Sequence, residues 1–127
     1  MGGIVHSTGK ALTGYENLKV WQLAMDLVVE VYELAKRFPR EELYSLTDQI
    51  KRSAVSIPSN IAEGGSRHSN KEFVRFLYIA LGSASELETQ LLIVERIGYA
   101  QTTSLLKDRL IPIKKMLNAL ITSRKAR

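Results

Sequence analysis

Cysteine is absent from the 127 residues of this chain. Its absence excludes disulfides, thiolate nucleophiles and cysteine-based metal sites. Three prolines and eight glycines are too few for collagen-like or proline-rich order. No apolar run approaches the roughly 18 residues of a membrane span, and no secretory signal is visible at the amino terminus. We therefore expect a cytoplasmic protein with no membrane partner.

The composition that remains is that of one folded domain, since 45% of the residues are hydrophobic and 24% are charged. Residues 1–14 contain four glycines and no sustained apolar run, which predicts a flexible leader. No shift in composition marks a second domain in residues 15–127. The sequence therefore predicts a single domain behind a short leader.

Apolar residues recur at three- and four-residue spacing in four segments, at about 16–37, 45–64, 69–98 and 103–124. Pro39 ends the first segment, a glycine pair ends the second, and Ser69 stands three residues before Glu72, the spacing of a capping box. Pro58 and Pro112 each predict a kink, bend or short break. No hairpin signal or sustained strand period is present. Four such helices with short connections predict an all-α, antiparallel up-and-down four-helix bundle.

The net charge of +5 is concentrated in one place. Residues 99–127 hold seven Lys and Arg against one Asp, whereas residues 1–98 sum to −1. On an ideal helix Lys107, Lys114 and Lys125 fall within about 20° of one another, opposite the predicted core face. Such a strip could neutralise phosphates, and its predicted nucleic-acid-binding residues are Lys107, Lys114, Lys115, Arg124 and Lys125, with Arg127 as a further contributor. The alternative is a solvated outer face, and a symmetric oligomer would favour the binding interpretation because it multiplies the strip.

Polar residues form a stripe along one side of the second segment. Its members lie within about 80° of Arg52 on an ideal helix, opposite an apolar side. Arg52 and Glu63 are three turns apart, so we expect each to find a partner on another helix or another subunit. Glu86 follows the small residues 82–85 of the third segment, which would let another helix approach closely. The predicted structural or interface residues are Gln49, Arg52, Ser56, Asn60, Glu63 and Glu86.

An enzymatic interpretation would use Glu63 and Glu86 as an acid–base pair and Arg52 as an anion clamp. No nucleophile–base pair is visible, and neither His6 nor His68 has ligand-like company. The Glu-x-x-His signature of di-iron bundles is absent. We therefore expect no catalytic residue, no metal and no cofactor.

Three minor features are ambiguous. The glycine-rich, basic turn 64–69 resembles a phosphate-cradling turn before a helix, but it lacks the Walker pattern and is more simply an interhelical turn. Trp21 could stack on bases but is expected in the core. Tyr44 and Tyr99 lie near loops, and their roles stay open.

Several motifs together resemble one known family. They are Phe38-Pro39, Glu42, Gln49-Ile50, Arg52-Ser53-Ala54, Ser56-Ile57-Pro58-x-Asn60-Ile61-Ala62-Glu63-Gly64, Phe73, Glu86-Leu87-Glu88 and Gly98-Tyr99. This pattern resembles the four-helix bundle protein family, first noticed as reading frames in intervening sequences of bacterial large-subunit ribosomal RNA genes. The resemblance covers about residues 15–122. One departure, Ser45 where a glycine is expected, affects only a loop.

The resemblance implies an up-and-down bundle that assembles as a homopentamer. The family is also similar to the accessory variability proteins of diversity-generating retroelements, which are basic pentamers that bind nucleic acid and partner a reverse transcriptase. Our leading hypothesis is a non-enzymatic, oligomeric bundle that binds RNA or DNA through the basic strip. The alternative is a protein-interaction scaffold or accessory subunit for a reverse transcriptase or other enzyme, without direct nucleic-acid binding.

Overall fold

The computed structural model describes residues 14–127, and these residues contain four helical segments and no strand. The all-α class predicted from the sequence is confirmed. The predicted leader lies outside the described residues except for Gly14. The elements in chain order are η1 (Gly14–Asn17), α1 (Lys19–Ala35), η2 (Arg40–Glu42), α2 (Leu46–Gly65), α3 (Asn70–Arg96), α4 (Thr103–Leu105), η3 (Leu106–Leu110) and α5 (Ile111–Lys125).

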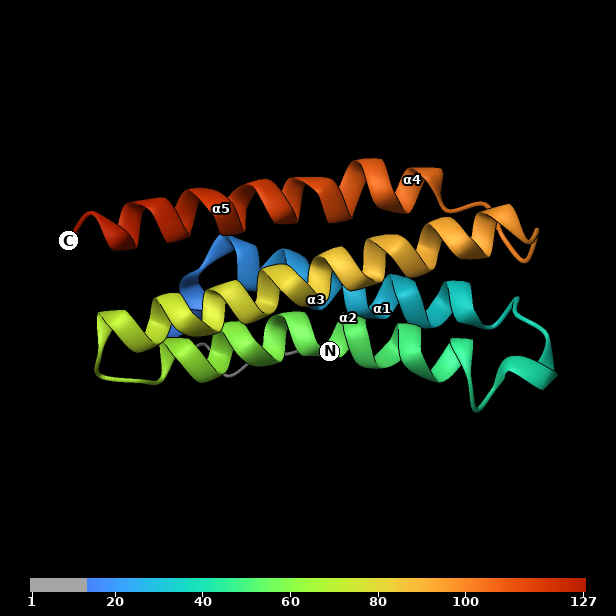
Figure 1. Cartoon of the computed structure of the whole chain (residues 1–127), viewed down its shortest axis with the longest axis horizontal. Helices are drawn as coiled ribbons and strands as arrows, with labels where there is room; N and C mark the ends of the chain where they lie inside the picture. Colours follow the sequence, from blue (N-terminus) through green and yellow to red (C-terminus); the bar gives the residue numbers. More distant parts are fainter. Residues whose placement is uncertain (1–13) are drawn as a thin grey trace, which may run out of the picture.

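Successive long helices run in opposite directions, and α4, η3 and α5 follow one another without interruption as the fourth rod (Figure 1). Helix α3 packs against both α2 and α5, and α1 packs against α2 and α5. The apolar faces of all four rods pack together in one core. Its largest fully buried side chains include Leu27, Ile50, Ile57, Leu77, Leu87, Leu91 and Leu117. Burying each such side chain stabilises the fold by about 1.5–3 kcal/mol.

The connection between α2 and α3 depends on a close approach of the two helices. Ser69 caps α3 as predicted, since its hydroxyl oxygen accepts the backbone N–H of Glu72 at 3.2 Å. A Cβ at Gly64 would lie 2.7 Å from the Cβ of Phe76 and 3.0 Å from a ring carbon of Phe73. Gly64 is therefore a packing residue inside α2, which continues to Gly65.

The two internal prolines have different consequences. Helix α2 continues unbroken through the buried Pro58, so the short break considered there does not occur. Before Pro112 the chain forms a π-helical turn, η3. A proline ring clashes with the carbonyl four residues earlier, here that of Asp108, and the wider π turn gives that carbonyl room. At Pro112, where the sequence predicted a bend, the structure has a π turn just before the proline.

At the other end of the bundle, two carboxylates accept hydrogen bonds from the connection between α3 and α4. Tyr99 donates its hydroxyl to a Glu42 carboxylate oxygen at 2.7 Å. The Ser45 hydroxyl and then the Tyr99 hydroxyl lower the pKa of Glu42, and this carboxylate in turn raises the pKa of Tyr99. Glu95 accepts the backbone N–H of Thr102 at 2.7 Å. Tyr99 is thus structural.

The other two aromatic residues singled out in the sequence occupy different environments. Trp21 packs against the core, as expected, and meets Tyr15 edge-on with 5.4 Å between the ring centroids. Tyr44 is 91% exposed.

Candidate nucleic-acid interface

Two of the cations on the fourth rod are paired with acids of neighbouring helices. The Nζ of Lys114 lies 2.6 Å from a carboxylate oxygen of Glu88 on α3, and the two side chains are 26% and 31% exposed. The Nε of Arg109 lies 2.8 Å from a carboxylate oxygen of Glu30 on α1. Lys114 therefore lies at the seam between α5 and α3, and its predicted place on the outward strip is wrong.

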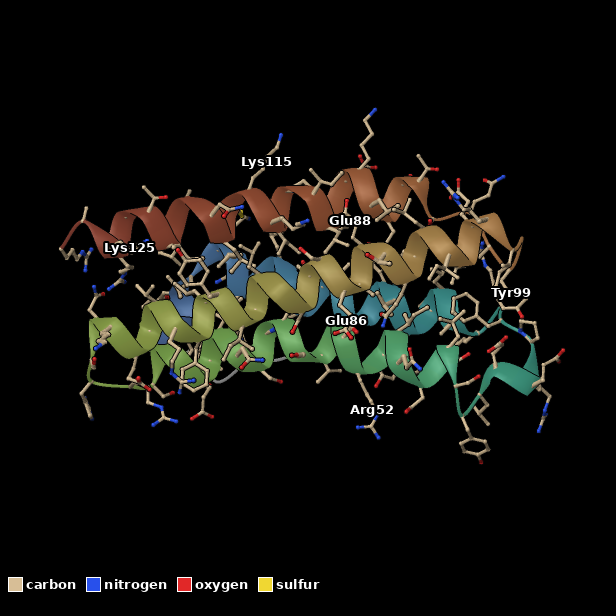
Figure 2. All side chains as sticks on the ribbon, viewed as in Figure 1. Arg52, Glu86, Glu88, Tyr99, Lys115 and Lys125 are labelled. Carbon is tan, nitrogen blue, oxygen red and sulfur yellow. The ribbon has the colours of Figure 1, made fainter. Side chains whose placement is uncertain are left out.

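The π turn explains why the ideal helical wheel fails here. An α-helix advances about 100° per residue, whereas a π turn advances roughly 80°. Counting through η3 in this way puts Lys107 within roughly 30° of Lys115 and roughly 80° from Lys114. Lys107 and Lys115 are both exposed, and within residues 14–127 neither forms an ion pair. Figure 2 shows Lys115 pointing away from the bundle. The outward strip of the fourth rod thus consists of Lys107 and Lys115.

The cations at the carboxyl end of α5 rest on aromatic rings of α3. The guanidinium of Arg124 lies 4.9 Å from the centroid of Phe73, and the Nζ of Lys125 lies 5.7 Å from that of Tyr78. The Arg124 carbonyl accepts the Asn70 side-chain amide at 2.6 Å. A ring attracts a cation without neutralising it, so both residues keep a full positive charge at this end of the bundle.

Further basic residues that the sequence analysis did not place at the interface lie close to this end. Arg67 and His68, in the turn between α2 and α3, line the same pocket as Arg124 and Arg127. Arg67 and Arg124 are 57 positions apart in the sequence, so only the antiparallel packing of the helices brings them together. The glycine-rich, basic composition of the turn was the one local signal for them.

Further along α3, Arg75 pairs with Glu72 at 3.2 Å. The hydrogen bond from Arg75, more than the nearby cations, lowers the pKa of Glu72. The charge of this arginine is therefore matched within its own helix, unlike the charges of Arg124 and Lys125.

The charged members of the polar stripe on α2 have local partners. Arg52 is 79% exposed and its Nε lies 2.8 Å from a carboxylate oxygen of Asp48, one turn earlier in the same helix. Glu63 pairs with Arg67 at 2.7 Å. The expectation that Arg52 and Glu63 need partners from another helix or subunit is therefore wrong. Arg52 and Asp48 pair because side chains four residues apart share one face of the helix, and Arg67 reaches Glu63 from the turn that follows α2.

Two uncharged members of the stripe, Ser56 and Asn60, lie at the contact between α2 and α3. The hydroxyls of Ser56 and Ser83 are 2.7 Å apart, and the Asn60 amide donates to the Ser56 hydroxyl at 2.9 Å. The small residues of α3 therefore do allow a close approach at this point.

The remaining members lie on the outer face. Gln49, Arg52 and Glu86 line a shallow pocket of about 310 Å³ there. In Figure 2 the Arg52 side chain points away from the bundle. Because Ser56 also lines it, this pocket lies on the outer side of the α2–α3 contact.

The structure does not bring the two acids of the enzymatic interpretation together. Glu63 and Glu86 are both exposed, and Glu63 is not among the residues that line the pocket of Glu86. In the part of the chain that the structure describes, no group of three or more His, Asp or Glu could hold a metal ion. Over the same residues, no helix combines the length and the apolar character needed to cross a membrane.

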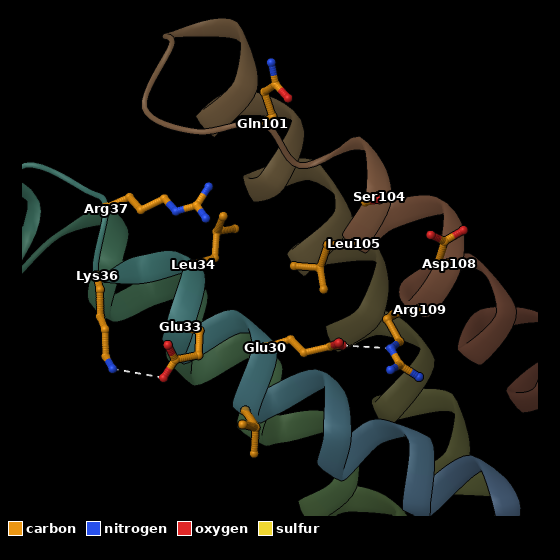
Figure 3. Close-up of a pocket in the computed structure, with 11 residues that line it drawn as sticks. Glu30, Glu33, Leu34, Lys36, Arg37, Gln101, Ser104, Leu105, Asp108 and Arg109 are labelled. Carbon is orange, nitrogen blue, oxygen red and sulfur yellow. Dashed lines mark hydrogen bonds and ion pairs between the residues drawn. The ribbon is translucent and has the colours of Figure 1, made fainter.

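A larger groove of about 840 Å³ lies between α1 and the α4–η3 segment. Figure 3 shows its charged residues partly satisfying one another, with Glu30 paired to Arg109 and Glu33 to Lys36. Both signs of charge are therefore represented in its wall, and the groove offers no concentrated field for an anion or a cation.

The chain matches one family model, and its fold matches a solved structure. Residues 16–119 match the family model described as 23S rRNA-intervening sequence protein. The fold is similar to the crystal structure of a protein of unknown function from the S23 ribosomal protein family of Bacteroides thetaiotaomicron, with a TM-score of 0.73 and 28% identity over 81% of this chain and 95% of that one. No curated protein matches the chain. Because the family model spans most of the chain, as the sequence motifs predicted, the protein belongs to the 23S rRNA-intervening sequence protein family.

Proposed function

We propose that the chain is a non-enzymatic, homo-oligomeric helical bundle that binds RNA or DNA by contacting phosphates. The observation that carries the proposal is the pair Lys107 and Lys115, which share the outward face of the fourth rod without an acidic partner in residues 14–127. Arg124 and Lys125 extend the basic surface to the end of α5. Lys114 is excluded from the binding surface because Glu88 neutralises it.

The chemistry suits a phosphate backbone. Exposed lysines act as flexible point charges, and each phosphate they neutralise releases a condensed counterion. This kind of contact carries no base specificity, so we expect affinity to depend on charge and strand shape more than on base sequence.

An apolar stripe on α3 supports self-assembly. Ile79, Ile93 and Ile97 are each at least 40% exposed. Glu86 lies seven residues from both Ile79 and Ile93, and a seven-residue spacing returns to the same face of a helix. The stripe thus combines apolar side chains with the polar pocket around Glu86 and Arg52, as an interface between copies of the chain requires.

The resemblance to pentameric relatives favours five copies. In a closed ring the outward lysines of one chain become a repeated basic surface, which raises the avidity for a long polyanion. Light scattering on the full chain should therefore give a mass near five times 14.3 kDa.

The binding surface is tested by comparing two double variants with the same change in charge. We expect Lys107→Gln/Lys115→Gln to weaken binding of a structured RNA at low salt by about tenfold or more, because phosphate contacts are lost. Lys19→Gln/Lys36→Gln, at the start of α1 and just after its end, removes two exposed lysines elsewhere and should change the affinity by less than about twofold. Equal weakening by the two variants would assign the binding to net charge and contradict the proposed surface.

The second candidate function is a scaffold for a reverse transcriptase or other enzyme without direct nucleic-acid binding. The exposed apolar stripe on α3 favours it, since the same surface could bind a protein partner. In that case wild type would give no RNA shift at low salt, and Ile93→Glu would abolish capture of the enzyme.

A further inference from the structure

A second basic feature lies at the end of the bundle, apart from the outward lysines. The turn between α2 and α3 and the carboxyl end of α5 both lie at this end, on the left side of Figure 1. Between them lies a pocket of about 500 Å³ that is also lined by Tyr15 of η1 and by Leu18, the residue before α1. This volume is within the range of pockets that hold small organic ligands.

The wall of this pocket is cationic. Arg67, Arg124 and Arg127 line it together with His68, and within residues 14–127 no Asp or Glu does. Arg67 is paired with Glu63, which lies outside the lining, so Arg124 and Arg127 supply the cationic charge of the wall that no ion pair within residues 14–127 balances. Planar guanidinium groups bind phosphate oxygens through pairs of parallel hydrogen bonds. The pocket therefore has positive charge and guanidinium donors of the kind that bind a phosphate group.

The position of the cations is fixed by aromatic packing. Arg124 lies over the ring of Phe73, and Arg67 lies with its guanidinium 5.1 Å from the centroid of Phe76. The wall beneath them is closed by tight contacts, since a Cβ at Gly65 would lie 2.7 Å from the Cβ of Tyr15. Ordering the two arginines before binding lowers the entropy cost of holding a ligand.

The lining also contains apolar surface suited to a base or sugar. Tyr15 contributes this surface, whereas Phe73 is buried and its ring is covered by Arg124. An aromatic ring beside arginines is a common way to hold a nucleotide, because the base packs on the ring while the arginines contact the phosphate.

We propose that this pocket binds the terminal phosphomonoester of a nucleic-acid strand, an inference that rests on the proposed function. A phosphomonoester carries about −1.5 to −2 charge and three strong acceptor oxygens, whereas an internal phosphodiester carries a single charge. Several arginines around one nucleotide-sized pocket match the more highly charged group. The outward lysines contact the strand, and the pocket recognises its end.

The test uses the full chain and three single-stranded RNA 12-mers of one sequence, bearing a 5′-phosphate, a 3′-phosphate or no terminal phosphate. We expect one phosphorylated end to raise the affinity about tenfold, and the arm that does so identifies which end is bound. Arg67→Gln/Arg124→Gln should abolish this gain. Arg127→Gln, at an exposed position, should reduce the gain without any effect on packing.

Two controls separate the pocket from general charge. Lys71→Gln/Arg75→Gln removes the same charge at the same end of the bundle from residues that do not line the pocket, and should preserve the gain. Lys107→Gln/Lys115→Gln should weaken binding of all three RNAs equally, so the ratio between them is kept. Circular dichroism melting checks that each variant is folded.

The outcomes distinguish this inference from the proposed function. Equal affinity for all three RNAs in wild type overturns the pocket assignment and leaves nucleic-acid binding intact. If no RNA binds, the proposed function fails, and calorimetric titration with uridine 5′-monophosphate decides the pocket alone. If wild type gives a heat of binding and Arg67→Gln/Arg124→Gln gives none, the phosphate site is supported. If wild type gives no heat of binding, the phosphate site is overturned.

Discussion

Gly64 shows how a single missing side chain sets the distance between two helices. Any Cβ there meets the Phe76 Cβ at 2.7 Å, so Gly64→Ala forces α2 and α3 apart. We expect a loss of about 1–3 kcal/mol in the free energy of unfolding, measured by urea denaturation. Gly82→Ala is the matched control, because nothing lies within 4 Å of its Cβ position, and it should stabilise by about 0.5–1 kcal/mol. Equal effects at the two sites would contradict the close approach.

Glu95 makes the stability sensitive to acid. Its carboxylate accepts the backbone N–H and the hydroxyl of Thr102, and these bonds lower its pKa from the usual 4.5. A carboxyl group whose pKa is lowered in the folded state contributes stability above its unfolded pKa and loses that contribution as the pH falls through the folded one. Wild type should therefore exceed Glu95→Gln in urea midpoint at pH 7, and the gap should close below about pH 4.5. A gap that is the same at pH 7 and pH 3 would refute the assignment.

At the residue scale, the sequence predicted the role of Ser69 but not the roles of Gly64 and Arg52. Ser69 was recognised as a cap because the hydrogen bond that it accepts is local in sequence. Gly64 was read as part of a helix stop, but its contacts are with α3, which no local pattern specifies. Arg52 finds its partner at Asp48 in its own helix, where the sequence analysis looked further away.

At the scale of the element, the π turn η3 decides which lysines face outward. Lys114 and Lys115 are neighbours with different environments, one paired with Glu88 and one exposed. We expect Lys114→Gln to cost on the order of 1 kcal/mol in urea denaturation, whereas Lys115→Gln stays within about 0.5 kcal/mol of wild type. RNA affinity should show the reverse order, with Lys115→Gln the weaker binder. The same order in both assays would mean that the rotation imposed by η3 is not as described.

The extents of the helices were predictable because apolar spacing, caps and prolines are local signals. The four expected segments correspond to α1, α2, α3 and the α4–η3–α5 rod. The form of the bend before Pro112 was not predictable, since a proline can be accommodated by a kink, a break or a π turn. In the π turn that forms, the first and last residues, Leu106 and Leu110, are both buried in the core.

At the scale of the whole molecule, assembly is expected to depend on the α3 stripe. Ile93 is 42% exposed, so Ile93→Glu should leave the single chain folded while placing a charge in the proposed interface. Light scattering should then fall from the mass of the oligomer toward 14.3 kDa. Ile111→Glu makes the same change at an exposed isoleucine on α5 and should leave the mass unchanged. Loss of the oligomer with both variants, or with neither, would exclude the stripe as the interface.

The tertiary arrangement also explains why the basic end of the bundle was missed. Local composition showed a basic last helix and a basic turn as separate features. Only the antiparallel packing brings the turn 64–69 against the carboxyl end of α5 (Figure 1). Long-range placement of this kind depends on the folded core, and a single sequence carries no direct record of it.

Phosphate binding by Lys107 and Lys115 is tested most directly by the salt dependence of RNA affinity. The logarithm of the binding constant, plotted against the logarithm of salt concentration, should fall with a slope of about −0.9 for each phosphate neutralised on a duplex. Removing both lysines should make the slope shallower by about 1.8 for each copy in contact with the RNA. A wild-type slope near zero, or the same slope in the double variant, would contradict phosphate binding by these residues.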